Sequence, residues 1–208
     1  MKGPFDFLAG KERGCAFLKW CLSAVAILMA APACETVQAP AHATKAILEE
    51  RHGEWSTRVL YTATEARFRA STWYGERDSA VVLNLDLAPG KCSNYVMTMN
   101  VGIPRTAQRS FSSDHLYGQI RVDDKSLHEI KYAYSTEQGQ PVVFISFYAF
   151  TAGGDLWQEL IQGNAVRFKL SAAERNYYLN FTLNGFSSAV TRIQEICIDL
   201  QNRTYFPN

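Results

Sequence analysis

Apolar and polar residues alternate from Trp55 onward, and this period of two most constrains how the chain folds. Successive side chains of a β-strand point to opposite faces, so an alternating run is typical of a strand with one buried and one solvated face. A further run, 142–150, is apolar on both faces, as expected of a central strand. The alternating runs occupy residues 55–61, 68–74, 81–87, 95–103, 120–122, 130–134 and 177–183.

The strands follow one another through connections that contain glycine or proline, such as Pro89-Gly90 and Gly153-Gly154. Parallel strands need long crossovers, which are usually helical, so strand after strand favours antiparallel pairing. We therefore expect a mainly β protein with about nine or ten strands. The predicted architecture is a single domain over residues 54–208, built as an antiparallel two-layer β-sandwich or a flattened barrel.

Two segments change to helical spacing. Residues 155–162 place apolar side chains three and four positions apart and stop at Gly163. We expect a short helix there and a second one over 186–196, packed on one side of the sheet. The second helix is indicated by a stripe that leaves the last residue at or just beyond the helix end: Phe186, Ala189, Val190, Ile193 and Cys197.

Residues 1–33 are typical of a cleaved signal peptide. Four basic residues precede an apolar run from Trp20 to Ala31, and Ala31-Pro32-Ala33 supplies the small residues of a signal-peptidase site. The apolar run covers about 12 residues, fewer than the roughly 20 that a membrane-crossing helix needs. Residues 34–53 are rich in alanine, proline and polar residues, and we expect a tether there with a short helix around 46–50.

Export determines how the cysteines are interpreted, and two of the five lie within the signal segment. Cys34 follows directly after Ala33, where a lipoprotein precursor carries its acylated cysteine. It is lipidated, free, or removed by cleavage after Ala43. Cys92 and Cys197 are then left as a pair, which in an oxidising compartment favours a disulfide over two buried reduced thiols.

The formal net charge of +1 excludes a protein that lives on nucleic acid, because such a protein needs a basic stripe to offset phosphate charge. Together with the export signal, the composition places the protein in the periplasm, or at the outer membrane or cell surface, of a Gram-negative bacterium. Contact with the membrane is expected only through a lipid on Cys34.

Motifs for catalysis, metal binding and cofactors are missing. None of the four histidines has another at i+2 to i+4, and no Gly-x-Ser-x-Gly, Ser-x-x-Lys, His-Glu-x-x-His or Cys-x-x-Cys occurs. His128 is expected to be a core or edge histidine. Asp123-Asp124, directly before Lys125, are expected to be turn residues rather than paired catalytic carboxylates. We therefore expect no metal, no cofactor and no enzymatic activity.

The polar segment 104–115 is the most suggestive loop, because it is too long for a tight hairpin and carries Arg105, Arg109 and Phe111. Arginine and aromatic side chains are over-represented among residues that supply interface energy. This segment is therefore the predicted binding surface. The alternative is a solvated connection with Phe111 folded back on the core.

The C-terminal third has a distinctive order: Gly163, a strand, a turn, a second strand, Leu183-Asn-Gly-Phe-Ser-Ser-Ala-Val190, a helix and Cys197. With Trp55 opening the first strand, it resembles the invasion-associated locus B family of exported proteobacterial proteins. The extra cysteines common in that family are missing here, which leaves strand order and disulfide pattern open. The resemblance implies a periplasmic or surface β-sandwich linked to envelope or host interaction rather than to catalysis.

Two functions from different classes follow from these features. The first is a non-catalytic envelope module that binds another protein or a surface glycan in adhesion or invasion, or that acts as an inhibitor or immunity protein against an envelope-targeting enzyme. The second is an envelope hydrolase with dispersed catalytic residues, for which Asp114 and His115 are the candidates. A cavity with a histidine hydrogen-bonded to a carboxylate or hydroxyl favours the hydrolase. A face of exposed aromatic residues favours binding.

Overall fold

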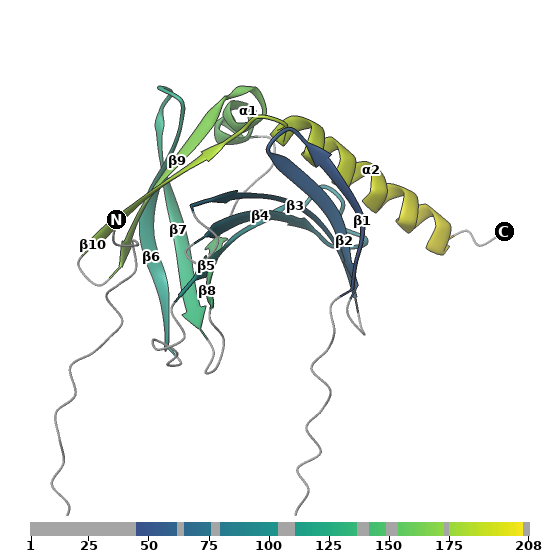
Figure 1. Ribbon diagram of the computed structural model, residues 1–208, viewed down its shortest axis with the longest axis horizontal. Coiled ribbons are helices and arrows are strands. Elements are labelled where there is room, and N and C mark those ends of the chain that lie inside the picture. Colours follow the sequence, from purple (N-terminus) through teal and green to yellow (C-terminus); the bar gives the residue numbers. More distant parts are fainter. Residues whose placement is uncertain are drawn as a thin grey trace, which may run out of the picture.

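The computed structural model describes residues 45–61, 65–75, 80–103, 111–136, 142–148, 154–172 and 175–205. Within them, ten strands form one antiparallel sheet in the order β1-β2-β3-β4-β5-β8-β7-β6-β9-β10 (Figure 1). The strands are β1 (Lys45–His52), β2 (Trp55–Tyr61), β3 (Ala66–Tyr74), β4 (Val81–Leu87), β5 (Val96–Gly102), β6 (Phe111–Val122), β7 (Leu127–Thr136), β8 (Val142–Tyr148), β9 (Ala165–Ala172) and β10 (Arg175–Thr182). The expected mainly β, antiparallel fold is confirmed, whereas the finer prediction of a sandwich or flattened barrel is not shown by this strand order.

One face of the sheet, the core face, carries the apolar half of nearly every alternating run. Met99 pairs with Leu83 on one side and with Ile145 on the other, and all three are buried. The same face continues through Tyr132 on β7 to Phe168 on β9. Burial of this one continuous apolar surface explains the period of two in the sequence.

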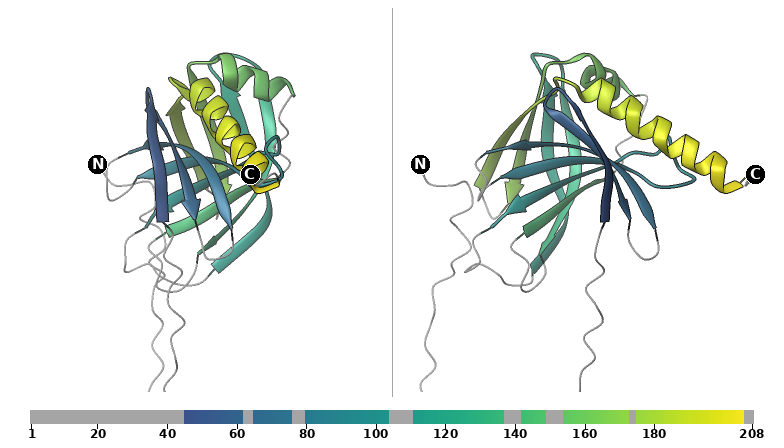
Figure 2. Two further views of the ribbon diagram at one scale, coloured as in Figure 1. Left: turned by 90° about the vertical axis from the view of Figure 1, so that its right-hand side faces the viewer. Right: turned by 45° about the vertical axis from the view of Figure 1, so that its right-hand side comes forward.

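Both helices pack on the core face. α1 (Asp155–Gln162) has the predicted bounds, and α2 (Phe186–Tyr205) begins where expected but continues well past residue 196. α2 contacts β1 to β4, while α1 contacts β6 and the start of α2 (Figure 2). Cys197 therefore lies inside α2, not at its end.

The first strand, β1, corrects the predicted tether, since residues 45–52 pair antiparallel with β2 and do not form a helix around 46–50. Leu48 has a positive φ of 54°, at a register shift between Ile47 and Glu50. This bulge interrupts the alternation that would have identified the strand. Glu50 also pairs with Arg192 of α2, with a closest N–O distance of 2.6 Å.

The central strand β8 differs from its sequence pattern. Val143, Ile145 and Phe147 lie buried on the core face, as predicted. Phe144 and Tyr148 point to the opposite, outer face, where they stay 40% and 45% exposed. A strand with neighbours on both sides thus has only one buried face here.

The turn between β10 and α2 docks onto the turn between β1 and β2. The Trp55 indole N–H donates to the carbonyl oxygen of Thr182 (2.9 Å), and its ring meets the ring of Phe186 edge-on at 4.8 Å. Gly185 has φ +90°, and a Cβ there would lie 1.7 Å from the carbonyl oxygen of His52. Only glycine fits this approach, because any side chain would collide with backbone.

The predicted disulfide is present. Cys92, in the connection between β4 and β5, is bonded to Cys197 of α2, and their Cα atoms are 5.7 Å apart. The bond ties the helix to an element 105 residues earlier in the chain. Cys34 and the predicted signal peptide lie outside the described residues.

We predict that replacing both bonded cysteines (Cys92→Ser with Cys197→Ser) lowers the free energy of unfolding by roughly 2–4 kcal/mol, because the unfolded chain regains the freedom of a long loop. Urea unfolding of both proteins under non-reducing conditions measures the difference. Peptide mapping that finds both thiols free in the exported wild-type protein would contradict the assignment.

Candidate binding face

The predicted 104–115 loop is only partly described. Arg105 and Arg109 lie outside the described residues, so their role as binding residues stays a prediction. Phe111 is not part of a loop but the first residue of β6. It is half-buried, packs against the core, and meets the ring of Tyr134 edge-on at 5.6 Å. This placement matches the alternative in which Phe111 folds back on the core.

Asp114 and His115, the hydrolase candidates, lie within β6 and not in the loop before it. They occupy a β-bulge, marked by a register shift between Ser113 and Leu116. His115 has φ +57°, is exposed, and stacks on Tyr148 with ring centroids 6.2 Å apart. The bulge turns His115 toward the outer face of the sheet.

A different histidine, His128, meets a carboxylate. Its Nε2 lies 3.0 Å from Oε2 of Glu159, which joins the start of β7 to α1. His128 also lines a cavity of about 560 Å³ beside β8, together with Ile120 and Phe147. The described residues that line this cavity include no serine, threonine or cysteine, but they do include Lys131, Tyr148 and Asp155.

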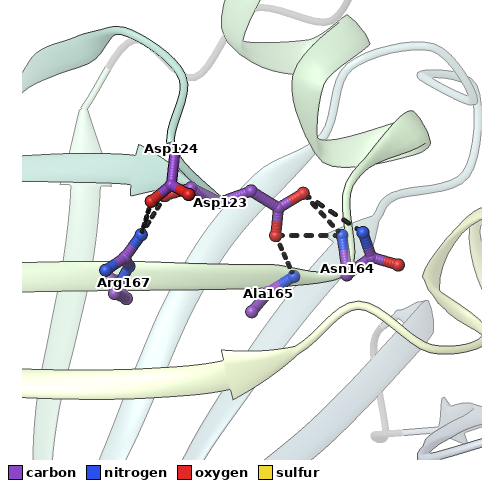
Figure 3. A network of polar contacts seen from close by, with 5 residues as sticks. All are labelled: Asp123, Asp124, Asn164, Ala165 and Arg167. Carbon is purple, nitrogen blue, oxygen red and sulfur yellow. Dashed lines mark hydrogen bonds and ion pairs between the residues drawn. The ribbon is translucent and has the colours of Figure 1, made fainter.

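Asp123 and Asp124 form the turn between β6 and β7, as predicted (Figure 3). The Asp123 carboxylate accepts hydrogen bonds from the backbone N–H groups of Asn164 (3.0 Å) and Ala165 (2.9 Å). Arg167 donates to the Asp123 carbonyl oxygen and pairs with the Asp124 carboxylate. The N–H of Asn164, with smaller contributions from Ala165 and Lys125, holds the pKa of Asp123 below its ordinary value. The Asp123 carboxylate thus joins the turn to β9, whereas the Asp124 carboxylate is fully exposed and contributes only an ion pair in solvent.

The outer face of β8, β7 and β6 carries a row of exposed aromatic and basic side chains. Tyr148 pairs with Lys131, and Lys131 pairs with Tyr117, so the three side chains lie side by side. The Lys131 ammonium lies 5.4 Å from the centre of the Tyr117 ring, within cation–π range. Tyr117 remains 52% exposed despite these contacts.

The next row extends this surface across β9 and β10. Gln119 of β6 pairs with Lys169 of β9, and Lys169 pairs with Tyr178 of β10. Tyr178 is 70% exposed. We call the set Tyr117, Lys131, Tyr148, Lys169 and Tyr178 the aromatic–basic strip.

The sequence reasoning missed this strip because it followed the buried half of each alternating run. Tyr117 and Lys131 occupy the solvated positions of their strands, where burial imposes no pattern. The signal available in the sequence was the presence of tyrosines at positions expected to face solvent, since most such positions are polar.

Other kinds of site find no support within the described part of the chain. No three His, Cys, Asp or Glu side chains there are grouped in a way that could hold a metal ion. Neither of the described helices has the length and hydropathy that crossing a membrane requires.

The fold and face define a mainly β protein with an antiparallel sheet, two helices on one face and exposed aromatic residues on the other. No family model matches the sequence, and neither does any curated protein. Among solved structures, the chain is similar to the crystal structure of invasion associated protein b from Bartonella henselae, with a TM-score of 0.46 and 20% sequence identity. The similarity covers 76% of this chain and 99% of that chain. That protein bears the name of the family which residues 163–197 resemble.

We predict that Phe111→Ala lowers the free energy of unfolding by roughly 1–3 kcal/mol, less than for a fully buried ring, because the half-buried side chain loses its contacts with Tyr134 and the core. Phe111→Leu, which keeps most of the apolar volume, is the matched control. Unchanged stability in Phe111→Ala, with a loss of partner binding, would instead support the loop as the contact surface.

A second prediction concerns pH. Because the folded-state pKa of Asp123 is lowered, its stabilising contribution is present above the unfolded-state pKa and is lost as the pH falls through the folded-state pKa. Asp123→Asn therefore lowers the melting temperature at neutral pH and makes the decline of melting temperature in acid shallower. Asp124→Asn, at a fully exposed side chain, is the control. The same acid slope in Asp123→Asn and wild type would refute the assignment.

Proposed function

We propose that this chain is an exported, non-catalytic binding module of the bacterial envelope, and that its aromatic–basic strip contacts another protein or a surface glycan. The observation that carries the proposal is the alternation of tyrosines and lysines across five neighbouring strands, where the tyrosines and Lys131 are exposed and Lys169 is partly exposed. Tyrosine offers a large, rigid area together with a polar tip, which is why it is common where proteins bind partners.

The charges of the strip indicate the chemistry of the partner. Arg121 lies on the same face as Lys131 and Lys169. It is opposite Arg167 of β9 in the strand register. Glu129 is the acidic residue between these groups, opposite Gln119. The excess of basic groups favours a partner surface that carries carboxylate, sulfate or phosphate groups, and such contacts weaken as salt rises.

Export is part of the same proposal. A disulfide that closes a long loop is typical of oxidising compartments, and it supports passage of this chain out of the cytoplasm. We propose that residues 1–33 direct that passage, and that the mature protein resides in the periplasm or at the cell surface. A lipid on Cys34 would hold it at the membrane.

A hydrolase is the second candidate, and the His128–Glu159 hydrogen bond beside a cavity favours it. A carboxylate that orients a histidine is one element of general base catalysis. The same contact also has a structural use, because it links α1 to β7. His128→Gln discriminates between the roles: a lowered melting temperature with unchanged partner binding supports the structural one.

We predict that Tyr117→Ala combined with Lys131→Ala weakens partner binding by more than about 1–2 kcal/mol, because truncating buried interface tyrosines and their charged neighbours commonly costs this much. The melting temperature stays nearly unchanged, since both side chains are exposed. The measurement is capture of envelope components by the immobilised exported protein, followed by titration of the captured partner.

Lys91→Ala is the matched charge control, because Lys91 is exposed and lies in the connection between β4 and β5, off the strip. Binding that survives in the strip variant and is insensitive to salt would contradict the proposed surface. Loss of binding in Lys91→Ala would point to net charge instead of position.

A further inference from the structure

A second surface on the outer face, over β2, β3 and β4, has the features of a ligand site. A cavity of about 480 Å³ opens there. A smaller one of about 230 Å³ adjoins it and shares two of its walls, Arg58 and Trp73. The larger volume is in the usual range for small-molecule sites. Its walls are Arg58, Ser71, Trp73, Gly75, Ala80 and Val82.

Arg58 is the unusual member of this wall. Its Nε atom is buried and has no hydrogen-bond partner among the described residues. Its side chain forms no ion pair with any described residue either. The side chain as a whole is only partly buried, so the unmet group is this one N–H donor, and an unmet buried donor is destabilising. The Nε–H of Arg58 can therefore take an acceptor from a bound ligand.

The nearby charges do not fill this role. Asp86, on the same face, is held by two hydrogen bonds from Arg69, at 2.6 and 2.7 Å. Glu50 forms an ion pair with Arg192 of α2. Glu49 lines the smaller cavity with Arg51, whose guanidinium carbon lies 5.8 Å from the centre of the Trp73 ring.

A second buried donor lies behind the cavity wall. Asn84, 1% exposed, accepts a hydrogen bond from the Ser71 hydroxyl at 3.1 Å, and Ser71 lines the cavity. The Nδ2 amide of Asn84 has no partner among the described residues. Two unmet donors thus lie at one site, on β2 and β4, the two strands that flank β3, and unmet buried donors are few in native structures.

Trp73 gives this site an apolar side. Its indole ring is 51% exposed beside the unpaired guanidinium. A large exposed tryptophan next to a partly buried arginine suits a ligand that combines a ring with an acidic group. The ring of such a ligand packs on the indole face, while its carboxylate accepts hydrogen bonds from the guanidinium.

We propose that the Arg58–Trp73 cavity binds a carboxylate-bearing sugar, of the uronic acid kind. The carboxylate neutralises Arg58, and the sugar ring packs on Trp73. This site lies on β2 to β4 and is separate from the aromatic–basic strip on β6 to β10, so the inference does not depend on the proposed function. It gives the chain an acidic-sugar subsite in addition to its partner surface.

Titration of the full exported chain with D-glucuronate, followed by NMR, tests this site. The Trp73 indole N–H and the Arg58 Nε–H signals are expected to shift in a saturable way. The methyl ester of glucuronate, which keeps the ring and loses the charge, is expected to bind at least tenfold more weakly. Equal binding of acid and ester would overturn the proposal.

Two variants separate the parts of the site. Arg58→Gln is expected to weaken glucuronate binding at least tenfold, and Trp73→Ala to weaken glucuronate binding without changing that of acetate. Arg67→Gln is the matched control, because Arg67 is an exposed arginine of β3 already paired with Glu65. Lys131→Ala, on the strip, is expected to leave glucuronate binding unchanged. Unaltered affinity in Arg58→Gln would contradict the proposal.

Stability provides a readout that does not need the ligand. If Arg58 is kept for binding, then Arg58→Met, which keeps the length of the side chain and removes its charge and unmet donor, raises the melting temperature of the ligand-free protein. A lowered melting temperature would show that Arg58 serves the fold, and it would overturn the assignment.

Discussion

The docking of Trp55 against the turn before α2 is the contact on which the rest of the structure depends. It brings the first two strands to the end of the last one, since the Trp55 indole N–H donates to Thr182 and the Glu54 N–H donates to Asn184. The same turn presents Phe186, which starts α2 over the sheet and packs on both Trp55 and Trp157. The disulfide then fixes α2 near its other end. The Leu183–Val190 segment is thus a structural junction, which joins β10 to α2.

Because α2 begins at this junction and lies over the sheet, the two faces of the sheet have different surroundings. The core face is covered by α1 and α2 and holds the apolar half of each strand. The outer face is left without a helix among the described residues, and its side chains are free of the packing constraint. Exposed rings and unpaired cations collect there: Tyr117 and Tyr178 over β6 and β10, and Arg58 with Trp73 over β2 and β3. Groups that weaken a core are tolerated on such a face, which is why we place both candidate binding surfaces on it.

The sequence predicted those parts of the fold that local burial determines. Eight strands and both helices follow from spacing, because a side chain that must be buried repeats with the period of its element. The disulfide was predicted from the two cysteines left after export. β1 was not predicted because the bulge at Leu48 interrupts its alternation, and because two acidic residues, Glu49 and Glu50, follow directly after it. The two candidate binding surfaces were not predicted for a different reason. Whether Lys131 lies beside Tyr117, or Arg58 near Ser71, depends on the register of strands that pair through long-range contacts, which no local pattern encodes. The Cys197 position was misjudged because the predicted helix was ended at residue 196, although Leu200, three positions after Cys197, also packs against the core.

The central claim is that the outer face, and not the cavity beside His128, is where this protein meets its partner. Oxidative footprinting of the exported protein, in buffer and in envelope extract, tests it by reporting how reactive each tyrosine side chain is. The account predicts that Tyr117 and Tyr178, which do not line the cavity beside His128, lose reactivity in the extract, while Tyr74, 44% exposed and off the strip, keeps it. Unchanged reactivity of the strip tyrosines, or an equal loss at Tyr74, would contradict the account.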